Sequence, residues 1–387
     1  MADLPPKKGD PEWEEWAEDI LDSTEFDTEL GKQISKDALR IAEGELSKAE
    51  FHERYGDEVK AEFGVDERPT KPDPEPDNTM PRVPGDRNQT RRNVLKAMGG
   101  AAAAVGLAGC VSASADDGSE SDGNPDSDTQ IGMAIDTERC IACLQCSEAC
   151  KEENNTDIGV HWPYVFRYED EHAGDTREDF LTRHCQHCSE PSCTYVCPTQ
   201  ARYRRTEDGI VLTDYDTCVG CKYCQVACPY GVNYLGKDEP NEVVGSEFEG
   251  DRVGRDGRTV GGNPPKGVMG KCTYCVHRQD SDDPELQGTT ACEQACPVDV
   301  IHFGDMNDRD SDPREHLREK EGSNQYRLLD EVGNEPNIVY IGKRPSKDAE
   351  PVQGPVSYEE LNMRDGNYDY VGAQDEAPAD GEEGDAA

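Results

Sequence analysis

Sixteen of the seventeen cysteines in this 387-residue chain fall into four groups of four, which we call quartets. The first and third quartets share the spacing C-x2-C-x2-C-x3-C, and the third is followed by a proline. The second reads C-x2-C-x4-C-x3-C-P, and in the fourth a long gap separates the two middle cysteines. In order, the members are Cys140, Cys143, Cys146 and Cys150; Cys185, Cys188, Cys193 and Cys197; Cys218, Cys221, Cys224 and Cys228; and Cys272, Cys275, Cys292 and Cys296.

This spacing is typical of the thiolates that hold a 4Fe–4S cluster in bacterial ferredoxins. A cube with four irons needs one soft thiolate at each corner, and cysteines three residues apart on a tight loop can reach three of them. In two-cluster ferredoxins, the fourth cysteine of the run ligates the other cluster. Four quartets therefore predict four 4Fe–4S clusters and a protein that transfers electrons.

Zinc, disulfides and a Rieske centre are the alternative uses of these cysteines. Structural zinc usually shows two separated C-x2-C pairs, and not three cysteines within seven residues followed by a fourth. A disulfide framework would suit an exported protein but gives no reason for the repeated spacing. A Rieske centre needs two histidines on one iron, whereas His184 and His187 stand beside a quartet made only of cysteines. We expect these histidines to pack near a cluster and to tune its potential.

The chain is strongly acidic, with 83 acidic and 40 basic residues and a formal charge of −43. Because the acidity runs along the whole length, we interpret it as the surface of a halophilic protein, which such charge keeps dispersed in high salt. The charge argues against a nucleic-acid partner. The alternative is an acidic protein from a mesophilic organism that does not live in high salt.

A short apolar tract from Ala97 to Cys110 precedes the quartets. It is shorter than a membrane span, which needs about eighteen apolar residues or more, and it fits the core of a signal peptide. Arg91 and Arg92 precede it in a pattern that resembles the twin-arginine export signal, and its end resembles a lipobox whose lipidated residue would be Cys110. We therefore predict export to the outer face of the cytoplasmic membrane, with Cys110 as a candidate lipid anchor. A chance arginine pair and an inert cysteine are the alternative.

Composition divides the chain into six segments. They are an acidic helical region with a proline-rich linker (1–89), the signal with its lipobox (90–110), a flexible tether (111–130), the cluster domain (131–304), a C-terminal extension packing on the core (305–357) and a disordered acidic tail (358–387). The long stretch before the arginine pair is unusual for an export signal. Three explanations are open: residues 1–89 are removed with the signal, they stay in the cytoplasm, or the protein is not exported.

In the N-terminal region, Trp13, Trp16 and Ile20 recur at helical spacing, and Ser47 to Phe63 predicts a second helix. A docking or regulatory helical hairpin is one interpretation, and a solvated spacer is the other. Two insertions in the cluster domain, 236–270 and 280–290, either contact a partner subunit or serve as charged surface padding.

The predicted fold class is α+β, with two ferredoxin-like modules of short strands and helices around the clusters. Residues 201–203 and 209–212 predict a β-hairpin, and residues 300–303 predict a strand after the last quartet. We expect helical turns to begin near the last cysteine of each quartet, namely Cys150, Cys197, Cys228 and Cys296.

Three stretches of the cluster domain resemble one known family. They are the run from Ala201 to Gly231, the run from Lys271 to Asp308, and the segment QYRLLDEVGNEPNIVYIG that ends at Gly342. Together they resemble the four-cluster iron–sulfur subunits of molybdopterin oxidoreductases, such as polysulfide, dimethyl sulfoxide and tetrathionate reductases and formate dehydrogenases. The resemblance covers residues 131–342 and leaves out the first 130.

The resemblance implies a nested use of the quartets, the first with the fourth and the second with the third. The four implied ligand sets are set A (Cys140, Cys143, Cys146 and Cys296), set B (Cys272, Cys275, Cys292 and Cys150), set C (Cys185, Cys188, Cys193 and Cys228) and set D (Cys218, Cys221, Cys224 and Cys197). The last cysteine of each quartet would thus serve a cluster held mainly by another quartet.

The resemblance also implies two partners, a molybdopterin catalytic subunit and a membrane subunit that handles quinone, with electrons hopping singly between them. The sequence shows no substrate pocket, nucleophile or acid–base pair. We therefore expect an electron-transfer subunit with no small-molecule substrate of its own, and not a catalyst by itself. The iron–sulfur component of a quinol-oxidising respiratory complex and a free-standing polyferredoxin are the alternatives.

Overall fold

The computed structural model describes most of the N-terminal region and of the cluster domain. The described residues are 5–68, 129–157, 159–172, 174–237, 248–346 and 348–351. Within them, no helix is both long enough and apolar enough to cross a membrane. Arg91, Arg92, Cys110, nearly all of the predicted tether and the predicted acidic tail lie outside the described residues.

A first module joins the two ends of the cluster domain. Strand β1 (Ile131–Asp136) pairs antiparallel with β8 (Ile301–Asp305), which confirms the strand predicted after the last quartet. Helix α5 (Gln145–Asn154) carries the end of the first quartet and packs against α9 (Ala291–Gln294), which carries part of the fourth. The module therefore brings together the first and fourth quartets, which are the most distant in sequence.

The chain beyond the last quartet completes the sheet of this first module. Strand β10 (Ile338–Ile341) lies parallel to β1, and β9 (Gln325–Tyr326) pairs antiparallel with β10. Helix α10 (Asp312–Glu319) packs against β1 and β8, and a 3-10 turn (Asp330–Val332) precedes β10. The sheet order is thus β8-β1-β10-β9.

A second module holds the second and third quartets. Helix α6 (Ser192–Tyr195) packs against α7 (Tyr223–Ala227), and between them the chain forms a hairpin of β4 (Arg202–Arg204) and β5 (Val211–Thr213). This is the hairpin that the sequence predicts. The mixture of helices and short strands in both modules confirms the predicted α+β class.

Helical turns precede the last cysteine of each quartet, so the prediction that they begin there is wrong. In the second, third and fourth quartets, α6, α7 and α9 end before the Cys-Pro pair. Proline disfavours helical geometry in the residue before it, and Cys228 is accordingly extended, with φ −76° and ψ 122°. Lys151 replaces the proline in the first quartet, and α5 runs through Cys150 to Asn154.

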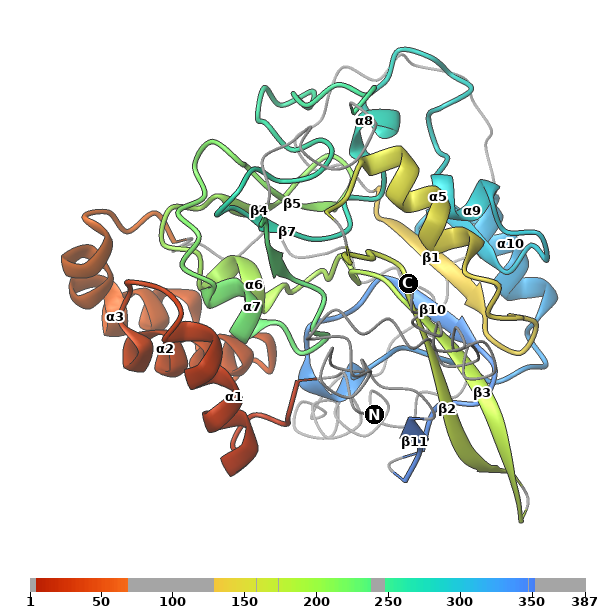
Figure 1. Cartoon of the computed structure of the whole chain (residues 1–387), viewed down its shortest axis with the longest axis horizontal. Helices are drawn as coiled ribbons and strands as arrows, with labels where there is room; N and C mark the ends of the chain where they lie inside the picture. The colour runs from red at the N-terminus through yellow and green to blue at the C-terminus, as the bar shows by residue number, and fades with distance from the viewer. Residues whose placement is uncertain are drawn as a thin grey trace, which may run out of the picture.

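Three helices at the N-terminus lie against the second module (Figure 1). They are α1 (Pro11–Leu21), α2 (Thr28–Ala42) and α3 (Lys48–Phe63). A capping box between Ser47 and Glu50 starts α3, and Gly64, at φ 72°, ends it. The predicted hairpin is thus a three-helix unit, because α2 was not predicted from the sequence. The unit packs on α6 and α7, which contradicts the solvated-spacer interpretation.

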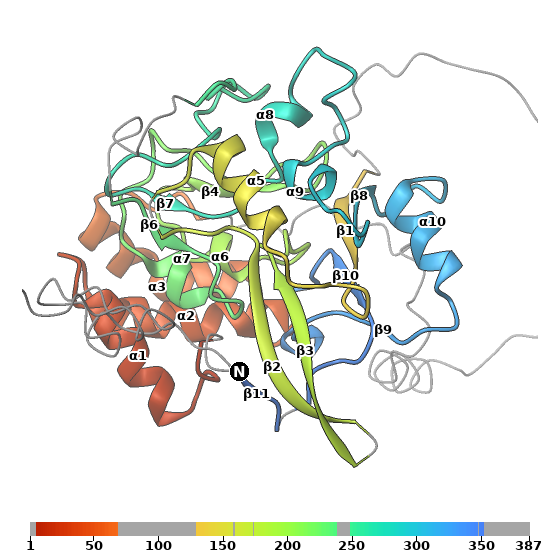
Figure 2. The same ribbon diagram turned by 45° about the vertical axis from the view of Figure 1, so that its right-hand side comes forward.

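The remaining strands surround the two modules. Between the first and second quartets, β2 (Tyr164–His172) and β3 (Asp175–Arg183) form a long antiparallel hairpin, which projects from the body in Figure 2, and β11 (Glu350–Pro351) pairs with β2. This hairpin was not predicted, because its strands are rich in charged residues. Strand β6 (Tyr234–Leu235) pairs with β7 (Met269–Gly270), which closes the insertion at 236–270.

Candidate metal centres

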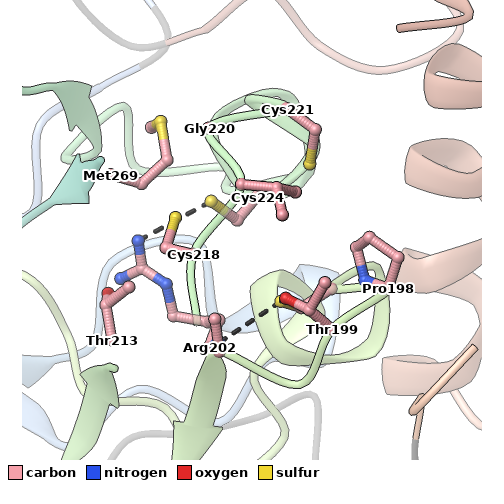
Figure 3. Close-up of a pocket in the computed structure, with 12 residues that line it drawn as sticks. Pro198, Thr199, Arg202, Thr213, Cys218, Gly220, Cys221, Cys224 and Met269 are labelled. Atoms are coloured by element: carbon pink, nitrogen blue, oxygen red, sulfur yellow. Dashed lines mark hydrogen bonds between the residues drawn. The ribbon is translucent and has the colours of Figure 1, made fainter. Parts of the chain in front are cut away.

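The thiols of sets A and D each surround a cavity. All four cysteines of set A line one cavity, with an empty volume of about 320 Å³, together with Ile141 and Leu144. All four of set D line another, of about 310 Å³, together with Arg202 and Thr213 (Figure 3). Each cavity therefore receives three cysteines from one quartet and one from a different quartet.

Sets B and C also come together in the interior. The Cys150 thiol lies within electrostatic range of those of Cys275, Cys272 and Cys292, and Asn154 Nδ2 lies 3.5 Å from Cys150 Sγ and 3.8 Å from Cys275 Sγ. These contacts assemble set B across α5 and α9. In set C, the Cys188 thiol interacts in the same way with those of Cys185, Cys193 and Cys228.

Electrostatic interactions between thiols of different sets show which sets are neighbours. Cys292 of set B interacts with Cys146 of set A, and Cys272 of set B interacts with Cys185 of set C. Cys193 of set C interacts in turn with Cys224 of set D. The order along the molecule is therefore A–B–C–D, with A and D at the two ends.

Exposed residues lie at the two ends of this order, whereas set B is fully buried. Cys143 of set A is exposed, and its neighbours Ile141 and Leu144 are 58% and 54% exposed. At the other end, Val219 lies between Cys218 and Cys221 of set D and is 43% exposed. Every cysteine of set B is buried. Apolar side chains therefore lie at exposed positions beside the thiols at both ends.

The repeated spacing gives the same loop geometry in the first and third quartets. Leu144 and Lys222, each two residues before the third cysteine, adopt left-handed backbone with φ of 63° and 62°. Gly220 is also left-handed, and a Cβ there would lie 2.3 Å from the carbonyl oxygen of Gly267. These turns direct successive thiols into one cavity, so the spacing and the fold agree at this point.

The electrostatics of the sets fit a cationic iron–sulfur core. Burial, and then the neighbouring thiols, raise the pKa of Cys146 to about 11, and burial also raises the pKa of Cys197 to about 11 and that of Cys272 to about 12. These thiols are therefore neutral near pH 7 unless a positive group holds them as thiolates. All sixteen donors are thiols, and none of the four sets combines cysteine with another type of ligand. This composition fits iron–sulfur clusters.

The spacing of the thiols favours a cluster over a single zinc ion. Four thiolates on one zinc would lie roughly 3.8 Å apart, since each Zn–S bond is about 2.3 Å. Among the residues that the structure describes, no three His, Cys, Asp or Glu side chains are grouped closely enough to hold one metal ion. The cysteines of set A and those of set D instead each line one cavity, which suits a group larger than a single ion.

Buried cations and neutral histidines lie between the sets. Arg202 and Lys271 are both fully buried, and Lys271 Nζ donates a hydrogen bond to the carbonyl oxygen of Cys272 at 2.9 Å. Burial lowers the pKa of His184 to about 4 and that of His187 well below its usual value, so both rings are neutral. His187 stacks on Tyr274, with ring centroids 3.7 Å apart, which agrees with the predicted packing role.

Arg202 was not predicted as a site residue. Its one signal in the sequence is its position on the predicted strand 201–203. Alternate residues of a strand face the same side, so the strand gives the direction of the side chain but not what it contacts. The insertion at 236–270 is partly internal, because Val260 and Asn263 are buried and the Asn263 side chain hydrogen-bonds Asp157. For these residues, surface padding is the wrong interpretation.

A half-buried ion pair connects the first and fourth quartets. Glu153 of α5 accepts hydrogen bonds from Arg278 Nε at 2.6 Å and Arg278 Nη2 at 2.5 Å, and its Oε1 lies 2.6 Å from His277 Nε2. His277 and Arg278 belong to α8 (Val276–Gln279). Burial alone would raise the pKa of Glu153, but these hydrogen bonds outweigh it and lower the pKa to about 2.

We expect Glu153→Gln to destabilise the protein by about 1–3 kcal/mol at pH 7, because it leaves Arg278 without its carboxylate. Since the folded pKa is lowered, the contribution of Glu153 is complete above about pH 4.5 and is lost as the pH falls towards 2. Chemical unfolding at pH 7 measures the difference. Glu152→Gln, on the exposed side of the same helix, is the control and should change little. Equal midpoints for the two variants would refute the role of the ion pair.

Two family models match the chain. The N-terminal region of 4Fe–4S ferredoxin iron–sulfur binding proteins matches residues 7–71, and a 4Fe–4S dicluster domain matches residues 176–256. The first match includes α1, α2 and α3, which the resemblance in sequence had left out. It therefore extends the likeness to iron–sulfur proteins into the N-terminal region.

Curated relatives match about half of the chain. A Halobacterium salinarum protein, assigned as the iron–sulfur subunit of a dimethyl sulfoxide reductase, is 39% identical over 55% of this chain and 79% of its own length. The menaquinone reductase iron–sulfur cluster-binding subunit of Nitratidesulfovibrio vulgaris is 32% identical over 55% of this chain and 89% of its own. The arsenate respiratory reductase iron–sulfur subunit of a Shewanella species is 32% identical over 55% of this chain and 96% of its own.

Proposed function

Because this chain belongs to the family of iron–sulfur subunits of molybdopterin oxidoreductases, we propose that it carries four 4Fe–4S clusters and relays electrons in such a complex. One end of the relay would face a molybdopterin catalytic subunit, and the other a membrane subunit that exchanges electrons with quinone. The observation that carries the proposal is the neighbour order A–B–C–D of the four thiol sets, with exposed side chains beside sets A and D.

The buried ligand sets and the two end sets would have different roles in electron transfer. A 4Fe–4S cluster accepts and returns one electron, and its potential depends on burial, hydrogen bonds to sulfur and local charge. The residues around sets B and C exclude water and supply buried cations. Those around sets A and D present the apolar residues Ile141, Leu144 and Val219, which suit contact with a partner subunit.

A quinone-linked complex without molybdenum chemistry is the second candidate. The relative from Nitratidesulfovibrio vulgaris, which is named as a menaquinone reductase subunit, favours it. The two candidates share the electron-transfer role of this chain and differ in the catalytic partner.

Purification of the chain with its native partners, without oxygen, tests the proposal. We expect about four irons and four acid-labile sulfides per set, together with a co-purifying subunit that contains molybdopterin. Zinc without sulfide would refute the clusters. Clusters in a chain that purifies alone would refute the complex and favour a free-standing polyferredoxin.

We also propose a halophilic source, which the charge of −43 supports, and export by the twin-arginine route with lipidation at Cys110. The twin-arginine route suits a protein whose clusters are inserted before export. Cleavage directly before Cys110, which lipidation there requires, would separate residues 5–68 from the cluster domain, whereas these residues pack on α6 and α7. Mass spectrometry of the mature protein tests the lipidation: a lipid-modified N-terminal Cys110 would support it, and residues 5–68 still joined to the cluster domain would refute it.

We expect Arg91→Lys combined with Arg92→Lys to leave the protein in the cytoplasm, because the export machinery recognises the arginine pair. Cell fractionation and immunoblotting measure the location. Arg82→Lys with Arg87→Lys makes the same chemical change just upstream and should leave the location as in the wild type. An unchanged location of the first variant would exclude the twin-arginine signal.

A further inference from the structure

Arg202 is a buried cation without a carboxylate partner among the described residues. Its side chain is 1% exposed, and its Nε and Nη1 atoms have no hydrogen-bond partner there. On the same strand, Arg204 Nη2 donates to Gln130 Oε1 at 2.6 Å. Arg205 pairs with Asp208 at 2.5 Å and with Asp280 at 2.9 Å. Of these three arginines, Arg202 is thus the one whose guanidinium has no side-chain oxygen as a hydrogen-bond partner among the described residues.

The groups around the Arg202 guanidinium are thiols of two different sets. Its Nη2 donates to Cys224 Sγ at 3.6 Å, and its backbone N–H donates to Cys197 Sγ at 3.3 Å (Figure 3). These two cysteines belong to set D. Its charge also interacts with Cys193 and Cys185 of set C. The side chain thus lies between the two sets of the second module.

A second buried cation makes the absence of a carboxylate more unfavourable. Lys271 lies near enough for its charge to act on Arg202, and its Nζ hydrogen-bonds only to carbonyl oxygens among the described residues. Burying one charge without a counter-charge opposes folding strongly, and burying two like charges together opposes it more. The surroundings of Arg202 and Lys271 therefore require an anionic group. Thiolate-bound clusters would supply this negative charge.

We propose that Arg202 is the shared counter-charge of sets C and D and raises the reduction potentials of both of their clusters. This inference rests on the proposed function. Each cluster that takes up one electron gains one negative charge, while the guanidinium keeps its proton. Arg202 therefore stabilises the reduced form more than the oxidised form. Its effect falls with distance, so sets A and B should feel it least.

The two halves of the relay would then differ in reduction potential. The Arg202 charge would favour electrons on the C–D half over the A–B half. Electrons that enter at set A would then run towards set D, beside the N-terminal helices.

Redox titration followed by electron paramagnetic resonance, on the cluster-loaded full chain, tests the proposal with Arg202→Met. At the wild-type midpoint potentials of sets C and D, we expect the ratio of reduced to oxidised cluster to fall about tenfold, or about 59 mV for one electron. The midpoints of sets A and B should stay unchanged. Arg204→Met removes the same charge two residues further along β4, away from the thiols, and should shift none of the four.

Two further variants separate charge from packing. Arg202→Lys keeps the charge and should restore most of the wild-type potentials. Thr213→Asp keeps Arg202 and places a carboxylate opposite it on β5, where the two residues are paired. It should lower the same two potentials, even if Arg202→Met fails to assemble its clusters.

The outcomes distinguish this inference from the proposed function. Full iron and sulfide with unchanged potentials in both Arg202→Met and Thr213→Asp would overturn the role of Arg202 and leave the clusters standing. An equal shift at all four sets would also overturn it, because the effect would not be local. Absence of iron and sulfide from the wild-type chain would instead refute the proposed function.

Discussion

Replacing Cys197 by serine should remove the cluster of set D and spare that of set C. Cys197 belongs to the second quartet in sequence, yet the structure places its thiol in one cavity with Cys218, Cys221 and Cys224. Serine is a poor ligand for iron at this position, so bound iron should fall by about a quarter. Cys228→Ser is the reciprocal change and should remove the cluster of set C.

Double variants show which cysteines share a cluster, because two losses at one site do not add. Cys197→Ser with Cys221→Ser should lose no more iron than either change alone. Cys228→Ser with Cys221→Ser should lose about twice as much. Iron and acid-labile sulfide analysis measures both. If the Cys197 and Cys221 losses add, while those of Cys228 and Cys221 do not, the nested pairing is wrong and each quartet holds its own cluster.

Gly31→Ala should destabilise the contact between the N-terminal helices and the second module. A Cβ on Gly31 in α2 would lie 2.6 Å from Tyr223 Cε1 and 2.9 Å from Leu21 Cδ1. Tyr223 is buried, directly precedes Cys224, and donates a hydrogen bond from its hydroxyl to the Asp27 carbonyl oxygen at 2.8 Å. Overpacking of this kind costs about 1–3 kcal/mol, which exceeds the helix-propensity gain of about 1 kcal/mol.

Gly56→Ala is the matched control for this prediction. Gly56 also lies within a helix, α3, but its nearest neighbour to a new Cβ would be Asp66 Oδ2 at 3.4 Å, an ordinary contact. Alanine there should therefore stabilise the protein by up to about 1 kcal/mol. The apparent melting temperatures of the two cluster-loaded variants measure the difference. A Gly31→Ala variant as stable as Gly56→Ala would show that the helices do not pack tightly on Tyr223.

This contact matters because the N-terminal helices and set D share one hydrophobic core. Trp13, Leu21 and Ile34 of the helices lie in the same cluster of buried residues as Cys221 and Cys224. The helices therefore support the loop that carries the third quartet. A change that loosens them should disturb set D before set A, which lies at the opposite end of the order A–B–C–D.

Local patterns in the sequence predicted several elements correctly. The hairpin of β4 and β5 and the helix from Lys48 to Phe63 could be found because turn residues, helix caps and short-range periodicity act over a few residues. The predicted starts of the cluster helices are wrong, because proline disfavours helical geometry in the residue before it, as at Cys228. Helix α2 and the charged strands β2 and β3 were missed, because tertiary packing stabilises them more than local preference does.

The sequence by itself determined the chemistry of this protein, because the ligand types and their spacing set the kind of metal group that a short loop can hold. Only the tertiary structure decided which thiols meet, since set A joins residues from the loop after β1, from α5 and from the chain just beyond α9. It also decided the order of the sets and the position of Arg202 between two of them. These features depend on distances between residues far apart in the chain, and such distances are settled by the packing of the whole fold.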